Sequence, residues 1–205
     1  MKNFWNDIDN WSTNDDQGAT LHDTVDNHEA MYEECVRFTG WVPETSEETD
    51  LYTEKIRKIT PTMRHRKPNF RPSNDRWFAI PDEKNFPSIY EFLQKNSHQY
   101  FGTIISKMGP GCWLLPHTHG SYAPDGTPPA EEYLYNMSLN YPDGCKFAVY
   151  SRGIIPFRAG DIYKIDVTQY HAVSNDSKSD RYHLMMRNKK FWEWAKKALD
   201  ISDWV

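Results

Sequence analysis

Three histidines have the residue types and the spacing of a metal site. His117 and His119 alternate within LLPHTHG, and His171 lies much later, in TQYHAVSN. Alternate side chains of a strand point to the same face, so a regular strand would place Leu115, His117 and His119 together. Two early ligands followed by a late histidine are typical of facial iron(II) sites, which normally also contain a carboxylate. The alternative is that each is an ordinary core or surface histidine.

An arginine follows His171 closely, in HAVSNDSKSDR. A hairpin between the two segments would place Arg181 on the strand beside His171, facing the same cavity. Arg181, His183 and Met185 alternate, so they would share a face and form a polar interior lining. A buried guanidinium needs an anionic partner, and a dicarboxylate cosubstrate would supply one through a bidentate contact. The alternative is a surface arginine.

Short β-runs separated by turn signals fill the chain from Tyr100 to Arg187. The turn signals are GPG, two PDG triplets, AGD and NDSKSD, and this rhythm of short strands is typical of a sandwich or barrel. We predict strands at 100–108, 112–119, 132–142, 145–151, 154–158, 161–167, 170–175 and 181–187.

Two helices are predicted beside these strands. The first spans 86–96, where Pro87 suits the first turn, and the second spans 189–200. We expect residues 1–99 to form a helical and irregular region that packs on the core. Residues 100–205 would form that core and its C-terminal helix, so that the chain is one compact domain.

The segment 103–187 resembles the aspartyl/asparaginyl β-hydroxylase family of iron(II)- and 2-oxoglutarate-dependent oxygenases. The resemblance lies in four motifs that occur in the family's order: SKMGPGCWLLPHT, LNYPDGCK, GDIYKIDVTQYHAVSND and RYHL. It implies a mainly β fold, the double-stranded β-helix or jelly roll. It also implies that iron(II) and 2-oxoglutarate are the cofactor and the cosubstrate.

The resemblance implies roles for individual residues. His117 matches the first iron ligand and His171 the last. Arg181 matches the partner of the distal carboxylate of 2-oxoglutarate, and Ser106 matches a hydroxyl that assists it. Ser106 and its neighbour Lys107 point to opposite faces of their predicted strand, so only one of them can enter the cavity.

His119 departs from the family pattern, because some members have a glycine there and keep only two protein ligands. It could be a third, neutral metal ligand, a residue behind the ligands, or a substrate contact. Asp166, shortly before His171, could orient a ring N–H of a ligand or face its own turn. Trp113 and Tyr135 could line the substrate pocket or belong to the core.

An insertion at residues 121–133 is the second departure from the family pattern. After it, the family's arginine position reads Leu134 and its histidine position reads Asn136, which could still hydrogen-bond 2-oxoglutarate. The insertion could be a lid or a surface loop. Its acidic residues, Asp125, Glu131 and Glu132, are candidates for the missing carboxylate ligand.

Composition restricts the classes of partner. Among 205 residues there are 24 Lys and Arg against 29 Asp and Glu, and this net charge of −5 argues against a general nucleic-acid coat. No run approaches the roughly 18 apolar residues of a membrane span, and no secretory signal is visible, so we expect a soluble cytoplasmic protein. The three cysteines, Cys35, Cys112 and Cys145, are too widely spaced for a zinc motif, so we expect free thiols in a reducing compartment.

These observations predict a dioxygenase that hydroxylates an amino acid or a peptide or protein side chain. Metal ligands would be His117, His119 and His171, and cosubstrate contacts would be Ser106, Asn136 and Arg181. No separate catalytic side chain is required, since iron and cosubstrate supply the chemistry. The alternatives are a non-catalytic metal- or ligand-binding jelly roll and a three-histidine cupin-type dioxygenase that does not use 2-oxoglutarate. The basic stretch 55–76 either contributes to substrate selection or is simply solvated.

Overall fold

The computed structural model describes residues 18–43, 76–118 and 133–190. In chain order the elements are β1 (Ala19–Thr24), α2 (His28–Arg37), β2 (Val42–Pro43), β3 (Arg76–Ala79), α4 (Pro87–Lys95), β4 (Tyr100–Met108), β5 (Trp113–His117), β6 (Tyr133–Ser138), β7 (Cys145–Val149), β8 (Gly153–Ile154), β9 (Asp161–Asp166), β10 (His171–Asn175) and β11 (Arg181–Asn188). The first predicted helix and most of the predicted strands are confirmed. The strand predicted at 154–158 is wrong beyond Ile154, because β8 spans only Gly153–Ile154 and Pro156 cannot donate to a strand ladder. Residues 55–75, 119–132 and 191–200, on which parts of the sequence predictions fall, lie outside the described residues.

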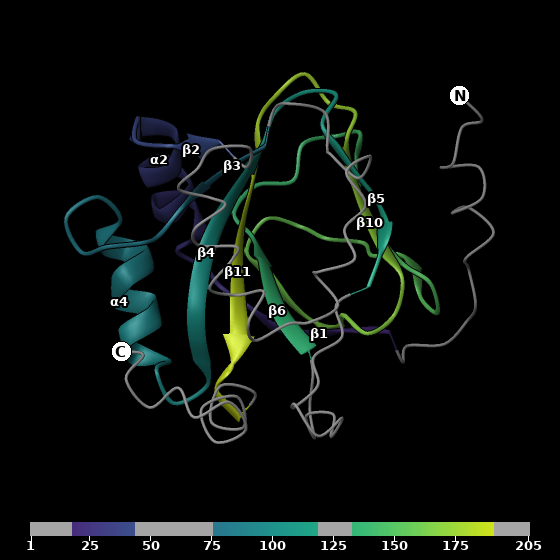
Figure 1. Cartoon of the computed structure of the whole chain (residues 1–205). Coiled ribbons are helices and arrows are strands. Elements are labelled where there is room, and N and C mark those ends of the chain that lie inside the picture. Colours follow the sequence, from purple (N-terminus) through teal and green to yellow (C-terminus); the bar gives the residue numbers. More distant parts are fainter. Residues whose placement is uncertain (1–17, 44–75, 119–132, 191–205) are drawn as a thin grey trace.

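The strands form two antiparallel sheets (Figure 1). The larger sheet has the order β1-β9-β6-β11-β4-β3-β2, and the smaller has the order β5-β10-β7-β8. From β4 onward the chain passes back and forth between the sheets, with β7 and β8 both in the smaller one. This is a double-stranded β-helix with flanking helices, as predicted.

The two faces of the larger sheet bury different sets of residues. On the outer face, Ile105, Met137 and Leu184 join a core with Met31 of α2 and Ile89 of α4. Figure 1 shows the helices on this side and the smaller sheet on the other. The inner core contains Phe147 and Val173 of the smaller sheet together with Tyr163 and Ile165 of the larger one. The space between the sheets is therefore closed by apolar side chains from both.

The part of the chain before residue 99 contributes strands as well as helices. β1 pairs with β9 at one edge of the larger sheet, while β2 and β3 extend the other edge beyond β4. A buried carboxylate joins the two helices. The Glu34 side chain of α2 accepts hydrogen bonds from the backbone N–H groups of Ser88 (2.7 Å) and Ile89 (3.3 Å). These donors belong to the first turn of α4, which has no partner for them within the helix.

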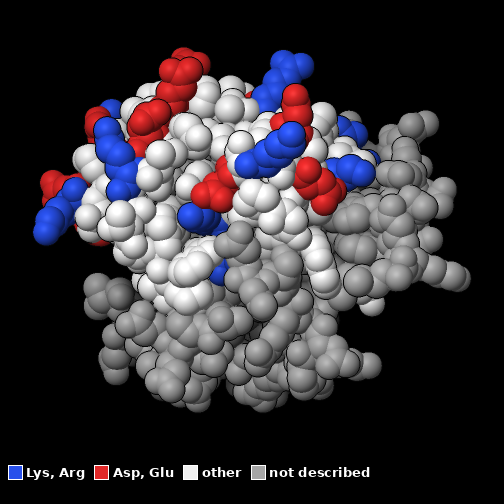
Figure 2. Space-filling view, turned by 90° about the horizontal axis from the view of Figure 1, so that it is seen from above, with Lys and Arg blue, Asp and Glu red and all other residues white. Residues whose placement is uncertain are grey.

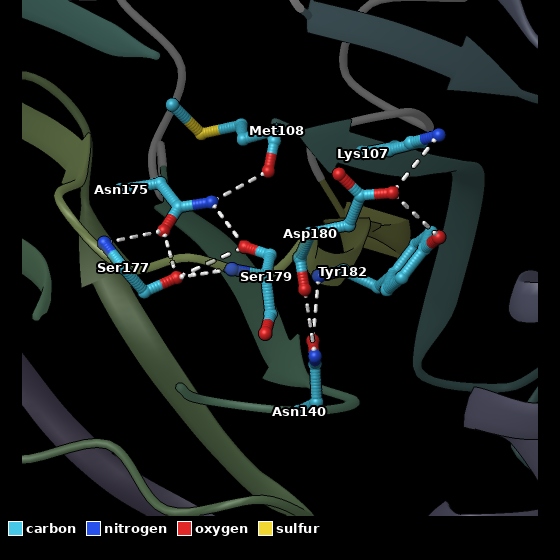
Figure 3. A network of polar contacts seen from close by, with 8 residues as sticks. All are labelled: Lys107, Met108, Asn140, Asn175, Ser177, Ser179, Asp180 and Tyr182. Carbon is cyan, nitrogen blue, oxygen red and sulfur yellow. Dashed lines mark hydrogen bonds and ion pairs between the residues drawn. The ribbon is translucent and has the colours of Figure 1, made fainter. Parts of the chain in front are cut away.

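The turn between β10 and β11 carries the chain from the smaller sheet to the larger one (Figure 3). The amide nitrogen of Asn175 donates to the carbonyl oxygens of Met108 and Ser179, both at 2.8 Å. At the other end of the turn, Asn140 donates to the carbonyl oxygen of Asp180 and accepts from the backbone N–H of Tyr182. Two buried or half-buried asparagine side chains thus fix the backbone on either side of residue 181.

The described surface carries mixed charge. Figure 2 shows acidic and basic side chains interspersed on the described part of the face seen from above. All three cysteines are free and buried. No helix within the described ranges is long and apolar enough to cross a membrane.

Candidate functional site

A bulge in β5 brings His117 into the space between the sheets. His171 lies opposite His117, and Val173 lies opposite Leu114. Between these two pairs β5 has two residues, whereas β10 has only Ala172. Leu114 belongs to the inner core. A strictly alternating strand would send Leu114 and His117 to opposite faces, and the extra residue puts them on the same one. This corrects the regular alternation expected from the sequence. Pro116, which cannot donate to the strand ladder, lies within the bulge.

The structure brings His117 and His171 together. Their ring centroids lie 4.3 Å apart, and His171 is almost fully buried. Nδ1 of His171 donates to the backbone carbonyl oxygen of Gln169 at 3.0 Å. Because a carbonyl oxygen only accepts, the Nδ1 proton is fixed, and Nε2 is the nitrogen suited to a metal ion.

The ring of His171 is oriented by Gln169 and not by Asp166. The carboxylate of Asp166 accepts hydrogen bonds from the backbone N–H and the hydroxyl of Thr168 and from the side-chain amide of Gln169. Asp166 therefore faces its own turn, which was one of the two alternatives left by the sequence. Its effect on His171 is indirect, through the turn that carries the Gln169 carbonyl group.

Two adjacent imidazoles with one ring oriented in this way are the kind of donor pair that a divalent transition metal such as iron(II) binds. In the described ranges there is no group of three or more His, Cys, Asp and Glu side chains placed to hold a metal. His119 and the acidic residues of the 121–133 insertion lie outside those ranges.

Arg181 begins β11 and lies in the opposite sheet from His171. The hairpin expected from the sequence is wrong, because the 176–180 turn crosses between the sheets. Arg181 instead belongs to the larger sheet, whereas His171 belongs to the smaller one. Its guanidinium carbon lies 5.9 Å from the ring centroid of Phe147, and that ring also stacks with His171 at 6.2 Å. The same aromatic ring therefore adjoins both residues.

The positive charge of Arg181 is buried without a described anionic partner. The side chain is 3% exposed, and no carboxylate among the described residues forms an ion pair with it. One of its terminal nitrogens donates to the Sδ atom of Met108 at 3.2 Å, while Nε makes no hydrogen bond to any described residue. Burial lowers the pKa of the guanidinium, although an arginine remains charged in proteins. Such a charge is costly unless an anion compensates it.

Ser106 and a second arginine lie on the same inner face. Ser106 is 4% exposed and stands between Phe78 and His183 in the sheet register. Nε of the buried Arg76 lies 3.4 Å from its hydroxyl oxygen, and the Arg76 guanidinium lies over Phe78. Arg76 and Arg181 flank Met108 on neighbouring strands.

Lys107 points to the other face of the sheet and pairs with Asp180 at 3.0 Å. Ser106, rather than Lys107, is therefore the buried residue that lies beside His183. Arg76 was not predicted as a site residue, since it falls at the end of the basic stretch 55–76. Its alternation with Phe78 at the start of a strand was the available signal.

Asn136 of β6 is buried and contacts His183. Nδ1 of His183 forms a short hydrogen bond with the side-chain amide of Asn136 and lies 3.2 Å from a terminal nitrogen of Arg181. Burial, and secondarily Arg181, lowers the pKa of His183 well below 6.5, so the ring is neutral. Leu134, at the family's arginine position, packs against the inner core.

Aromatic rings pack around His183 and Arg181. Phe157 meets His183 edge-on at 5.1 Å, and Tyr141 lies 5.6 Å from the Arg181 guanidinium. Burial raises the pKa of Tyr141 to about 12 despite Arg181, so its phenol stays protonated. Tyr135, a candidate pocket residue from the sequence, instead packs in the outer core beside Tyr100. Trp113 is only half-buried at the start of β5.

The family model for aspartyl/asparaginyl beta-hydroxylase matches residues 74–190, which is more than half of the chain. The chain belongs to the aspartyl/asparaginyl β-hydroxylase family. The match includes all the described strands from β3 to β11, so the residues discussed above lie within it. Membership of this family makes the protein a hydroxylase-type oxygenase.

Similar solved structures include two enzymes and one protein that is described as a predicted enzyme. A viral collagen prolyl hydroxylase from Paramecium Bursaria Chlorella virus-1, solved with 2OG, is 13% identical with a TM-score of 0.42; the match covers 69% of this chain and 88% of that one. A predicted oxalate decarboxylase from Thermotoga maritima is 15% identical with a TM-score of 0.36, over 55% of this chain and 79% of that one. The polyketide cyclase RemF from Streptomyces resistomycificus is 10% identical with a TM-score of 0.36, over 56% and 65%. Among curated protein sequences no significant match is found.

Proposed function

We propose that the protein is an iron(II)- and 2-oxoglutarate-dependent dioxygenase that hydroxylates an amino acid or a peptide or protein side chain. The observation that carries this proposal is the buried charge of Arg181. It is 3% exposed, shares the neighbour Phe147 with His171, and has no carboxylate partner among the described residues. A carboxylate of a bound ligand would compensate this charge, and a guanidinium holds a carboxylate through two parallel hydrogen bonds.

His117 and His171 would hold the iron, with His119 as a candidate third ligand. The fixed Nδ1 proton of His171 supports this, because it makes Nε2 a neutral donor atom. When bound, iron and 2-oxoglutarate together supply the oxidising power that a C–H bond requires. The chain's own residues orient these groups and keep water away from them.

Arg181, Ser106 and Asn136 would hold 2-oxoglutarate. The ring of Phe147 lies near both the Arg181 guanidinium and the His171 ring, so the proposed carboxylate partner and the proposed metal ligand adjoin the same aromatic side chain. Leu134 adds no charge here, so Arg181 is the principal cation for the cosubstrate.

The test is turnover with defined components. Iron-loaded protein is given 2-oxoglutarate, oxygen, and a panel of free amino acids and synthetic peptides, and succinate and product masses are measured. We expect succinate to form only with iron and 2-oxoglutarate, and one panel member to gain the mass of one oxygen atom. The His171→Ala variant should form no succinate.

Two other outcomes would replace the proposal. Binding of metal and 2-oxoglutarate without succinate would indicate a non-catalytic binding protein. Oxidation of a panel member in the absence of 2-oxoglutarate would indicate a cupin-type dioxygenase.

A further inference from the structure

His183 is a buried polar group whose outer nitrogen has no partner in the described structure. The residue is 2% exposed, and Nε2 makes no hydrogen bond to any described residue. A buried polar atom left unpaired costs stability, so its retention beside Arg181 calls for a ligand. In the sheet register His183 lies directly opposite Ser106 on one side and Ser138 on the other.

The contacts of the inner nitrogen assign the ring proton. Nδ1 lies 3.2 Å from a guanidinium nitrogen of Arg181. A guanidinium carries donors only, so Nδ1 accepts, and the proton of the neutral ring is on Nε2. The structure places Oδ1 of Asn136 beside Nδ1. A guanidinium has no acceptor to offer, whereas the two ends of an amide exchange by a half-turn, so the assignment that satisfies both contacts turns the NH₂ group of Asn136 towards Nδ1. Nε2–H is consequently a hydrogen-bond donor without a described acceptor.

We propose that His183 donates Nε2–H to the carboxylate that Arg181 binds, and so determines selectivity for a 2-oxo acid with a distal carboxylate. This rests on the proposed function. The positive charge of Arg181 attracts the carboxylate. The neutral imidazole of His183 donates a hydrogen bond in a fixed direction and adds no second positive charge. Phe157, which meets the ring edge-on, limits where His183 can point.

The test compares two ligands that differ only at the distal end. 2-Oxoglutarate carries a carboxylate there, and 2-oxopentanoate carries a methyl group, whereas both keep the 2-oxo acid group. Anaerobic affinities for the iron-loaded protein are measured for wild type, His183→Leu and His183→Gln. Glutamine can place an N–H close to the position of Nε2, so it is the conservative variant.

We expect His183→Leu to weaken 2-oxoglutarate binding about tenfold or more, because the lost hydrogen bond is to a charged group. Its affinity for 2-oxopentanoate should change little, and His183→Gln should recover most of the loss. The nitrogen NMR signal of wild-type Nε2–H should also shift when 2-oxoglutarate binds, but not with 2-oxopentanoate. Leu184→Ala, on the opposite face of the same strand, is the control for general destabilisation.

Equal weakening of both ligands by His183→Leu would overturn the proposal and make His183 structural. So would unchanged affinity for both. Failure of the proposed function looks different, because wild type would then not distinguish 2-oxoglutarate from 2-oxopentanoate at all.

Discussion

The two faces of the larger sheet are built from the same strands but serve different ends. On the outer face Ile105, Met137 and Leu184 are fully buried among apolar side chains and the helices. The neighbouring residue on each of these strands points to the inner face. These residues are Ser106, Asn136 and His183, which are also buried but are polar. Alternation alone separates these sets, since successive side chains point to opposite faces.

The difference indicates which residues stabilise the fold and which are kept for a ligand. Apolar burial on the outer face contributes directly to stability. The inner face buries a guanidinium and an imidazole, each with one nitrogen that has no hydrogen-bond partner among the described residues, and each of these is a cost in the absence of a ligand. Substitutions on the outer face should therefore lower stability and leave ligand affinity nearly unchanged, whereas substitutions on the inner face should do the reverse.

The largest effect on stability is expected on the outer face. Leu184→Ala removes a side chain that is 0% exposed, and a cavity of this kind typically costs about 2–5 kcal/mol. Urea denaturation measures the loss. Affinity of the folded fraction for 2-oxoglutarate should stay within about twofold of wild type. A large loss of affinity would show that the two faces are coupled.

Replacing the buried cation should give the reverse pattern. Arg181→Met removes the charge, and we expect affinity for 2-oxoglutarate to fall about a hundredfold. Ligand-free stability should be unchanged or higher, because an uncompensated buried charge is replaced by an apolar side chain of similar length. Thermal unfolding with and without 2-oxoglutarate tests both statements. A strongly destabilised variant with normal affinity would make Arg181 a structural residue.

An intermediate effect is expected at the turn that delivers Arg181. Asn175→Ala leaves the Met108 and Ser179 carbonyl oxygens without their 2.8 Å partner. The cost in stability should be about 1–3 kcal/mol, with a smaller loss of 2-oxoglutarate affinity. Ser179→Ala is the matched control, because its backbone rather than its side chain takes part in these hydrogen bonds. Equal effects of the two substitutions would contradict the assignment.

The smallest predicted effect is a pH dependence. The pKa of His183 is lowered in the folded protein, so only the unfolded chain takes up a proton just below pH 6.5. Above pH 6.5 the titration of His183 costs the folded protein no stability. Below pH 6.5 stability is lost as the pH falls towards the pKa that His183 has in the folded protein. The loss approaches about 1.4 kcal/mol per pH unit. Urea denaturation between pH 7 and 5 should show a shallower slope for His183→Gln than for wild type, and parallel slopes would refute the prediction.

Much of the fold was predictable because local and global signals agree in it. The strand from Tyr100 to Met108 has the predicted bounds, and Pro87 begins α4 at the predicted turn. β1 was not predicted, because it is a polar edge strand whose residues after Ala19 are mostly exposed, so it shows no alternation. The crossing of the 176–180 turn between sheets depends on packing that local patterns do not encode.

The candidate site was predictable in its residue types but not in its connections. His117, His171, Ser106, Asn136 and Arg181 were all chosen from the sequence. The structure brings His117 beside His171 in the smaller sheet, and it places the other three among the buried polar residues of the larger one. The partner of the His171 ring is a backbone carbonyl, which no residue type reveals. The bulge that aims His117 inward was detectable in principle, since Pro116 within a strand favours one.

The most direct test of the central claim is an anaerobic titration of iron(II) and 2-oxoglutarate, followed by the visible charge-transfer band of the chelate. We predict a band for wild type, none for His171→Ala, and for Arg181→Met a band that requires about a hundredfold more 2-oxoglutarate. Absence of the band in wild type at saturating iron and 2-oxoglutarate would contradict the proposal that this cavity binds both.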